Sequence, residues 1–100
     1  MAVTSKALFR GAASTSSTTL YTVPASTTAV VTNIVVTNTA TSSATYRLLL
    51  DDVSIATDVL ISGNDSVVID MKQVLATTKT IKGLASATTV NFHISGVEIA

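Results

Sequence analysis

The sequence contains no cysteine, which excludes both a disulfide framework and a thiolate metal site. His93 is the only histidine, so no histidine metal set is available, and we expect His93 at a surface or an interface. Six basic residues balance six acidic ones, and the formal net charge is zero. This balance argues against nucleic-acid binding driven by phosphate neutralisation, and it removes long-range repulsion between copies. The sequence therefore indicates no cofactor, no metal and no nucleic-acid partner.

Aromatic residues and long apolar runs are also scarce. There is no tryptophan, and the four aromatic residues are Phe9, Tyr21, Tyr46 and Phe92. We expect Tyr46 and Phe92 in the core, which leaves little for the exposed aromatic platforms that sugar-binding or base-stacking modules display. No stretch approaches the roughly 20 apolar residues of a membrane-spanning helix, and the N-terminus has no apolar run of signal-peptide length. We therefore expect no membrane partner.

The residues that are abundant favour β-structure. The chain has 18 threonines and 12 serines, and valine, isoleucine and threonine together make up 38 of its 100 residues. These three residue types are β-branched and suit a pleated surface. Short hydroxyl side chains lose little rotamer freedom on ordering, as expected of a surface that packs against other proteins. An all-β surface that is simply rich in threonine explains the composition equally well.

The stretch from residue 18 to residue 38, TTLYTVPASTTAVVTNIVVTN, is the most informative part of the chain. Apolar and polar residues alternate up to Val23, and Pro24 ends this first strand because proline lacks a ladder donor. A β-branched run over residues 28–38 predicts the longest strand. Both of its faces are largely apolar, which indicates a central strand covered on both sides over part of its length.

The remaining pattern predicts further short strands separated by turns. A helix over 67–76 is an alternative to a strand, because Val67, Met71 and Val74 also fit the helical period. The last strand changes phase after Ser95, which predicts a bulge at Ser95 and Gly96. About eight antiparallel strands spaced 8 to 12 residues apart predict an all-β fold, a single β-sandwich, with a jelly roll as one possible arrangement. The expected strands are 3–9, 18–23, 28–38, 45–51, 53–56 with 59–61, 67–76, 78–84 and 90–100.

Two further predictions concern the N-terminus and the aspartates. Residues 1–17 are expected to form an extended arm ahead of a sandwich domain of residues 18–100, lying on its own sheet or, as we favour, on a neighbouring subunit. Calcium binding by the four aspartates near the loops is an alternative, but their spacing lacks the regular calcium-loop pattern. We interpret them as turn-forming residues, and no catalytic residue is predicted. These aspartates are Asp51, Asp52, Asp58 and Asp65.

Three segments of the chain carry a resemblance to a known group of proteins. LYTVPASTTAVVTNIVVTN, ATYRLLL and the closing VNFHISGVEIA resemble small virion structural proteins of tailed bacteriophages. The similarity extends from about Leu20 to Ile99, and its motifs are structural. It implies a virion component that is not an enzyme, assembled in the host cytoplasm. No catalytic residue is carried over from the family.

The resemblance implies a head-decoration or cement protein on the capsid surface. Such a protein associates with its own copies, most often as a homotrimer, and with the major capsid protein or other virion proteins. A neck, collar or tail-fibre component is the alternative, and a carbohydrate-binding module is a more remote one. For the interface we select Val3, Lys6, Phe9 and Arg10 in the arm. We add Arg47, because a buried and unpaired arginine would be too costly to lie in the core.

Overall fold

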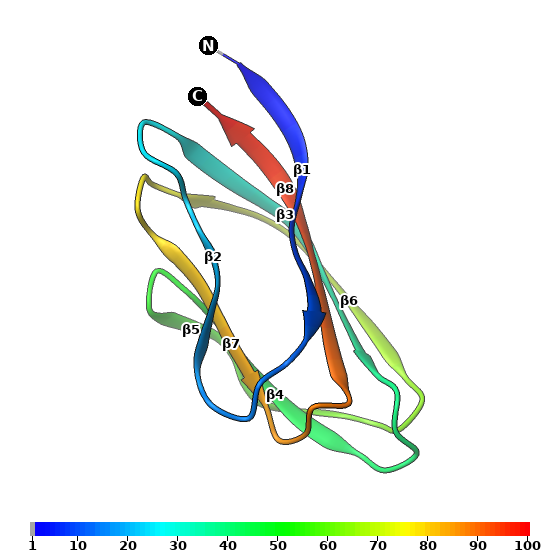
Figure 1. Cartoon of the computed structure of the whole chain (residues 1–100). Coiled ribbons are helices and arrows are strands. Elements are labelled where there is room, and N and C mark those ends of the chain that lie inside the picture. Colours follow the sequence, from blue (N-terminus) through cyan, green and yellow to red (C-terminus); the bar gives the residue numbers. More distant parts are fainter. Residues whose placement is uncertain (1) are drawn as a thin grey trace.

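The computed structural model describes residues 2–100, which form eight β-strands in two antiparallel sheets, without a helix (Figure 1). The predicted all-β sandwich is therefore confirmed. The strands are β1 (Val3–Ala12), β2 (Thr18–Thr22), β3 (Thr28–Asn38), β4 (Ala44–Leu50), β5 (Val53–Ile61), β6 (Ser66–Leu75), β7 (Thr80–Ala85) and β8 (Val90–Ile99).

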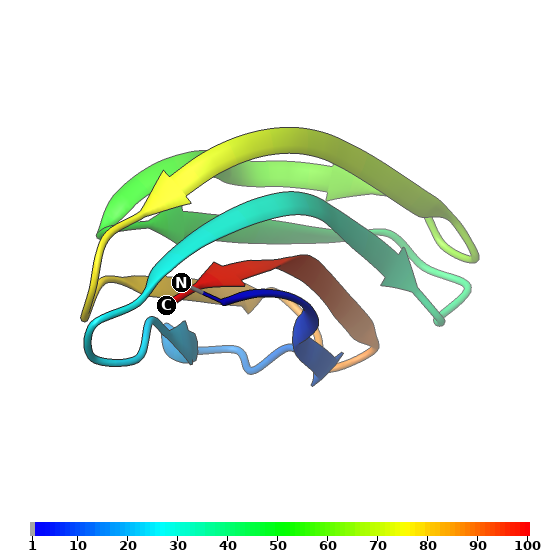
Figure 2. The same cartoon turned by 90° about the horizontal axis from the view of Figure 1, so that it is seen from above.

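The strand order is nested. One sheet has the order β1-β8-β3-β6 and the other has the order β2-β7-β4-β5. First pairs with last, second with seventh, third with sixth and fourth with fifth, as if one long hairpin were wrapped into two layers. Strands β1 and β2 consequently lie at one side of the sandwich and β5 and β6 at the other (Figure 2).

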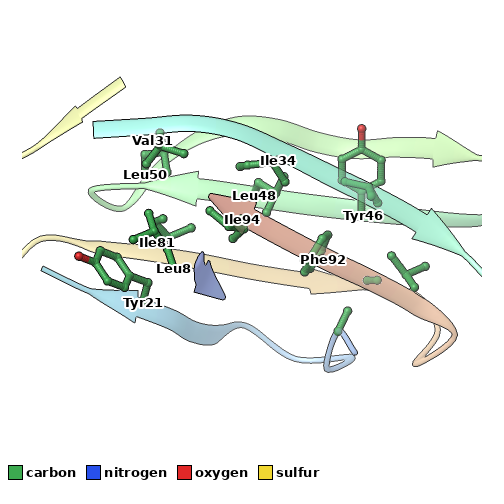
Figure 3. Close-up of a cluster of buried hydrophobic side chains, with 14 of the residues drawn as sticks. Leu8, Tyr21, Val31, Ile34, Tyr46, Leu48, Leu50, Ile81, Phe92 and Ile94 are labelled. Carbon is green, nitrogen blue, oxygen red and sulfur yellow. The ribbon is translucent and has the colours of Figure 1, made fainter. Parts of the chain in front are cut away.

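The core lies between the two sheets and is built from alternate residues of the inner strands. Figure 3 shows these side chains pointing toward one another from both layers. Tyr46 and Phe92 are both buried in the core, as predicted. Their rings meet edge to face, with their centroids 6.4 Å apart. The fully enclosed side chains of Ile34, Leu48 and Ile81 complete its centre. A core of this size needs no disulfide in a 100-residue chain.

The predicted bulge at Ser95 and Gly96 is wrong. Strand β8 keeps a regular alternation, and the extra residues lie on its two neighbours, at Leu8 of β1 and Thr32 of β3. Gly96 lies in the inward phase, and this position requires glycine because a Cβ there would lie against the carbonyl oxygen of Val30. The inward phase therefore continues to Glu98, whose burial the sequence pattern did not predict.

Strand β3 spans the residues predicted for the longest strand, and it lies inside its sheet between β8 and β6. Its two apolar faces have a different cause from the one expected. Val31 and Ile34 are both buried although they are three residues apart, because the irregularity at Thr32 moves the inward phase by one residue. Odd-numbered residues point into the core up to Val31, and even-numbered residues do so from Ile34 onward. In the sequence, this single buried face therefore looks like two apolar faces.

The turns follow the predicted residues. Asp51 and Asp52 connect β4 to β5 with φ angles of 53° and 59°, a left-handed conformation that aspartate tolerates well. Asn64, with φ of 56°, lies in the turn before β6. Asn38 is fully buried at the end of β3, where its amide group bonds to Ser42, Ile61, Ala40 and Thr89 and so ties three loops to the core.

Two segments with ambiguous patterns are strands. Residues 53–56 and 59–61 belong to the single strand β5, which is irregular near Asp58, where φ is 47°. The segment from residue 66 to residue 75 is the strand β6, not the alternative helix. Its heavy β-branching and its pairing with β3 outweigh the helical spacing of its apolar residues.

The N-terminal residues lie within the sandwich. Residues 3–12, which the sequence assigns to an arm, form the edge strand β1, paired with β8 over its whole length (Figure 1). Leu8 is buried, and Ala2 exchanges two backbone hydrogen bonds of 2.9 Å with Ala100. The arm thus lies on its own sheet, and the additional contact with a neighbouring subunit stays a prediction.

Candidate interface surfaces

Four of the five selected interface residues lie on the edge strand β1, but their environments differ. Val3 is exposed, and Arg10 is exposed and makes no ion pair within residues 2–100. Lys6 is half-exposed and pairs with Glu98, whereas Phe9 packs against the core. On strand β1, Val3 and Arg10 are therefore accessible, Lys6 is half-exposed but already paired, and Phe9 contributes mainly to the fold.

A polar cluster joins the two sheets beside this strand. The hydroxyl of Tyr21, on β2, donates a hydrogen bond to Oε2 of Glu98, on β8. Nζ of Lys6, on β1, lies 3.4 Å from the same carboxylate oxygen. Glu98 is the only glutamate in the chain, and its side chain is largely enclosed. The cluster satisfies an inward-pointing charge at the point where the two sheets meet.

The two bonded groups in this cluster shift each other's pKa. The hydrogen bond from Tyr21, followed by the one from Lys6, lowers the pKa of Glu98 below its ordinary value of 4.5, against the opposing effect of burial. Burial and the neighbouring carboxylate raise the pKa of Tyr21 well above its ordinary value. Tyr21 therefore remains a hydrogen-bond donor and Glu98 an anion at neutral pH.

Arg47, the fifth selected residue, lies apart from the other four. It projects from β4 in the opposite sheet, and its guanidinium holds Asp58 of β5 through two bonds, Nε to Oδ1 at 2.7 Å and Nη2 to Oδ2 at 2.8 Å. The hydrogen bond from Arg47 lowers the pKa of Asp58. Both side chains are about half exposed. Arg47 emerges at the surface, as its charge requires, and it is already paired within its own chain.

The side of the sandwich away from β1 and β2 carries an apolar surface that the sequence analysis did not predict. Strand β5 is exposed along almost its whole length, on both of its faces, and β6 exposes its outward face. The sequence did contain an indication of this surface, because the segment VSIATDVLI has apolar residues on both faces of the strand. This strand lies at the edge of its sheet, and both of its faces are largely exposed. The exposed apolar side chains are Val53, Ile55, Val59, Leu60, Val68 and Val74.

The charged loops form local pairs. At the β4–β5 turn, Asp51 lies 3.5 Å from Lys79 and Asp52 lies 2.7 Å from Lys82. His93 is exposed on the outer face of β8. Within residues 2–100, no group of three or more histidine, cysteine or acidic residues is arranged to hold a metal ion. The aspartates Asp51 and Asp52 are confirmed as turn residues, and Asp65 directly follows the turn before β6. The turn prediction is wrong for Asp58, which lies within β5 at the irregularity in its pairing with β4.

Comparisons with known proteins give a likeness to a solved structure. No model of a known protein family matches the chain, and no curated protein matches it. Among solved structures, a pentameric capsid protein isolated from metagenomic phage sequences aligns with 90% of this chain, at 17% identity and a TM-score of 0.40. The chain spans 58% of the length of that protein. In the part of the chain that the structure describes, no helix has the length and apolarity needed to cross a membrane.

Proposed function

We propose that this chain is a structural protein of a tailed-phage virion, not an enzyme, and that it acts as a decoration or cement protein on the capsid surface. The observation that carries the proposal is the resemblance of its strand motifs, from Leu20 to Ile99, to small virion proteins. In this role, copies of the chain contact one another and the major capsid protein. Their added contacts hold the capsid together against internal pressure.

The strand order supports this proposal. We interpret the orders β1-β8-β3-β6 and β2-β7-β4-β5 as a jelly roll, in which two Greek keys of an eight-stranded sandwich wrap around one core. Jelly rolls serve both in viral capsids and in lectins. The fold alone therefore does not distinguish a virion component from a glycan-binding module. The sequence motifs favour the virion component.

The surfaces of the sandwich also suit this role. Edge strands leave backbone groups unpaired, and a protein that assembles with its own copies covers such edges by symmetric contacts. Here one side of the sandwich presents the exposed Val3 and Arg10, and the other side presents the apolar residues of β5 and β6. We propose that β1 contacts the capsid, with Arg10 pairing with an acidic group of the shell, and that the chain forms homotrimers.

The test is binding to capsids that lack the protein. We expect the purified chain to saturate these capsids in a sedimentation assay, and to raise the temperature at which they break open. Arg10→Glu should weaken this binding, because it reverses an exposed charge on β1. Lys79→Glu, which reverses a half-exposed charge at the β4–β5 end, is the matched control and should bind as the natural chain does.

The alternatives predict other outcomes. A chain that ignores capsids but binds isolated necks or tails is a neck, collar or tail-fibre component, and the decoration role is then wrong. A chain that ignores all phage particles but is retained on immobilised host glycans is a carbohydrate-binding module. If Arg10→Glu saturates capsids with unchanged affinity, the decoration role is supported, but the proposed contact through Arg10 on β1 is wrong.

A further inference from the structure

The two sides of the sandwich are closed to different degrees. On the side of β1 and β2, the side chains of Leu8 and Tyr21 are buried, and the hydrogen bond from Tyr21 to Glu98 joins the two sheets. Strands β5 and β6 form the other side (Figure 2). There, no comparable contact joins the sheets in the part of the chain between β5 and β6 that the hydrogen bonds and ion pairs of residues 2–100 describe, and the inward residues are only partly covered.

The core becomes progressively uncovered along β5. Three residues of this strand lie directly opposite buried residues of β4, and they therefore face the core with them. Their exposed fraction rises from 1% at Ile61 through 38% at Val59 to 65% at Val53. On β6, the inward residues Val67 and Ile69 are also only partly buried. The hydrophobic core is thus open toward the β4–β5 turn. The three opposed pairs are Ile61 with Ala44, Val59 with Tyr46 and Val53 with Leu50.

Strand β5 presents apolar side chains and no unpaired charge. Besides the two valines, Leu60 is 66% exposed, and Ile55 is exposed as well. Asp58 is the only charged residue of the strand, and both of its carboxylate oxygens are bonded to Arg47 of the same chain. Depletion of charge is typical of the buried centre of a protein interface. We call the exposed apolar residues Val53, Ile55, Val59 and Leu60 the β5 wall.

The backbone of β5 is unsuited to pairing with another edge strand. Its register with β4 shifts twice, and Asp58, at one of these shifts, has a φ of 47°. Such irregularities protect an edge against the addition of a further strand. A partner therefore contacts the β5 wall through side chains, and the contact does not continue the sheet.

We propose that the β5 wall is the surface through which copies of this chain contact one another. This inference names the surface of the self-association in the proposed function and rests on it. The walls of the copies pack around a symmetry axis, which covers Val53 and Val59 and completes the core at its open side. In a homotrimer the three walls meet at the three-fold axis. Strand β1, on the other side of the sandwich, then remains free for the capsid.

Charge and timing both select a second copy as the occupant. The chain has no net charge and its β5 wall has no unpaired one, so two walls meet without repulsion. A charged surface of another protein would lose its hydration against this wall and gain no counter-charge. An exposed apolar surface of this kind also promotes aggregation of the free chain. Contact between copies covers the wall as soon as the chain has folded, whereas the shell would cover it only on attachment.

The test is the mass of the chain in solution, measured by light scattering over a range of concentrations. The natural chain should associate, and Leu60→Lys and Val53→Lys should each weaken this association by about tenfold or more, because each buries an unpaired charge in the contact. Thr19→Lys adds the same charge at an exposed position of β2, on the other side of the sandwich, and should associate as the natural chain does. Circular dichroism confirms that each variant is folded.

Mixing variants tests whether the wall meets the same wall of another copy. Leu60→Lys and Leu60→Glu should each associate weakly alone, and a mixture of the two should associate more strongly, because charges of opposite sign then meet at the axis. A mixture of Thr19→Lys with Thr19→Glu is the control for general attraction between oppositely charged chains. It should associate no more strongly than the natural chain.

The outcomes distinguish this inference from the proposed function. If Leu60→Lys and Val53→Lys associate with unchanged strength, the β5 wall is not the contact, and the self-association stands. A natural chain that keeps the mass of one copy at every concentration overturns both the wall contact and the homotrimer, and capsid binding by that monomer would still support the decoration role. A mass of two copies that both variants lose supports the wall contact and overturns the homotrimer. Failure of the Leu60 mixture to associate more strongly than its components would show that the wall meets a different surface.

Discussion

Glu98 is a charged residue whose position depends on contacts from both sheets. It lies in the inward phase of β8, where an apolar residue is the rule, and the hydroxyl of Tyr21 reaches it from the opposite sheet. Lys6 completes the set from the neighbouring strand. A sequence pattern cannot show this arrangement, because the three residues are far apart in the chain and each is ordinary by itself. This is why the apolar neighbours Val97 and Ile99 suggested a change of phase.

We expect this cluster to make stability depend on pH in the acid range. The folded pKa of Glu98 lies below its ordinary value of 4.5, so the carboxylate stabilises the fold above that value. The contribution is lost as the pH falls through the folded pKa, because the unfolded chain then binds the proton first. Denaturant unfolding of the natural chain should therefore show a decreasing free energy of unfolding from pH 6 to pH 3.

Two variants assign this pH dependence to the cluster. Glu98→Gln keeps an acceptor for Tyr21 but carries no charge, so it should be less stable at pH 7 and should lose less stability on acidification. Tyr21→Phe removes the hydrogen bond that contributes most to the low pKa of Glu98 and should reduce the acid loss in part. If Glu98→Gln retains the full acid loss, other carboxylates are responsible for it.

At the scale of elements, turn chemistry and β-branching were enough to locate most strands. Pro24 and the pair Asp51 and Asp52 mark turns by their backbone preferences, and the run from residue 28 to residue 38 coincides with β3. The failures occur where the pattern depends on neighbours. The continuity of β5 and the regular phase of β8 are decided by the strands beside them, which local sequence does not identify.

The candidate interface was predictable only in part, for a related reason. Arg10 and Val3 are exposed as expected, but Phe9 and Lys6 are engaged by the core and by Glu98. An arm and an edge strand have the same composition, and only the pairing partner distinguishes them. The exposed apolar face of β5 and β6 escaped notice because a strand does not reveal from its own residues whether a second layer covers it.

The edge strand β1 supports a prediction at this scale. Removing residues 1–10 should lower the free energy of unfolding by about 3 kcal/mol or more, because it removes the buried Leu8 and exposes the edge of β8. Denaturant titration measures the loss. The control is a chain lacking only residues 1 and 2, which should lose far less. A chain without residues 1–10 that is as stable as the full chain would show that these residues contribute nothing to the sandwich.

For the whole molecule, the nested order of strand pairing affects the folding rate more than any single contact does. Each of β1, β2 and β3 pairs with a strand that follows much later in the chain, so most of the sheet hydrogen bonds close long loops. Loop closure costs entropy before the contacts are formed, and domains of this kind fold slowly. The order of pairing is also the property that local sequence determines least, because many β-branched strands fit one another equally well.

A circular permutation tests this reasoning. Ala2 and Ala100 are already bonded to each other, so an Asn-Gly turn placed between them should connect β8 to β1 as a two-residue hairpin. New termini between Ser16 and Ser17 open an exposed connection. The longest-range pairing then becomes the most local one, and the folding rate in stopped-flow refolding should rise by roughly tenfold. The unfolding rate should change little, since the folded contacts are the same. A permutant that is equally stable but folds at the natural rate would show that β1 and β8 pair after the rate-limiting step, and that the inner pairs of the nest set the folding rate.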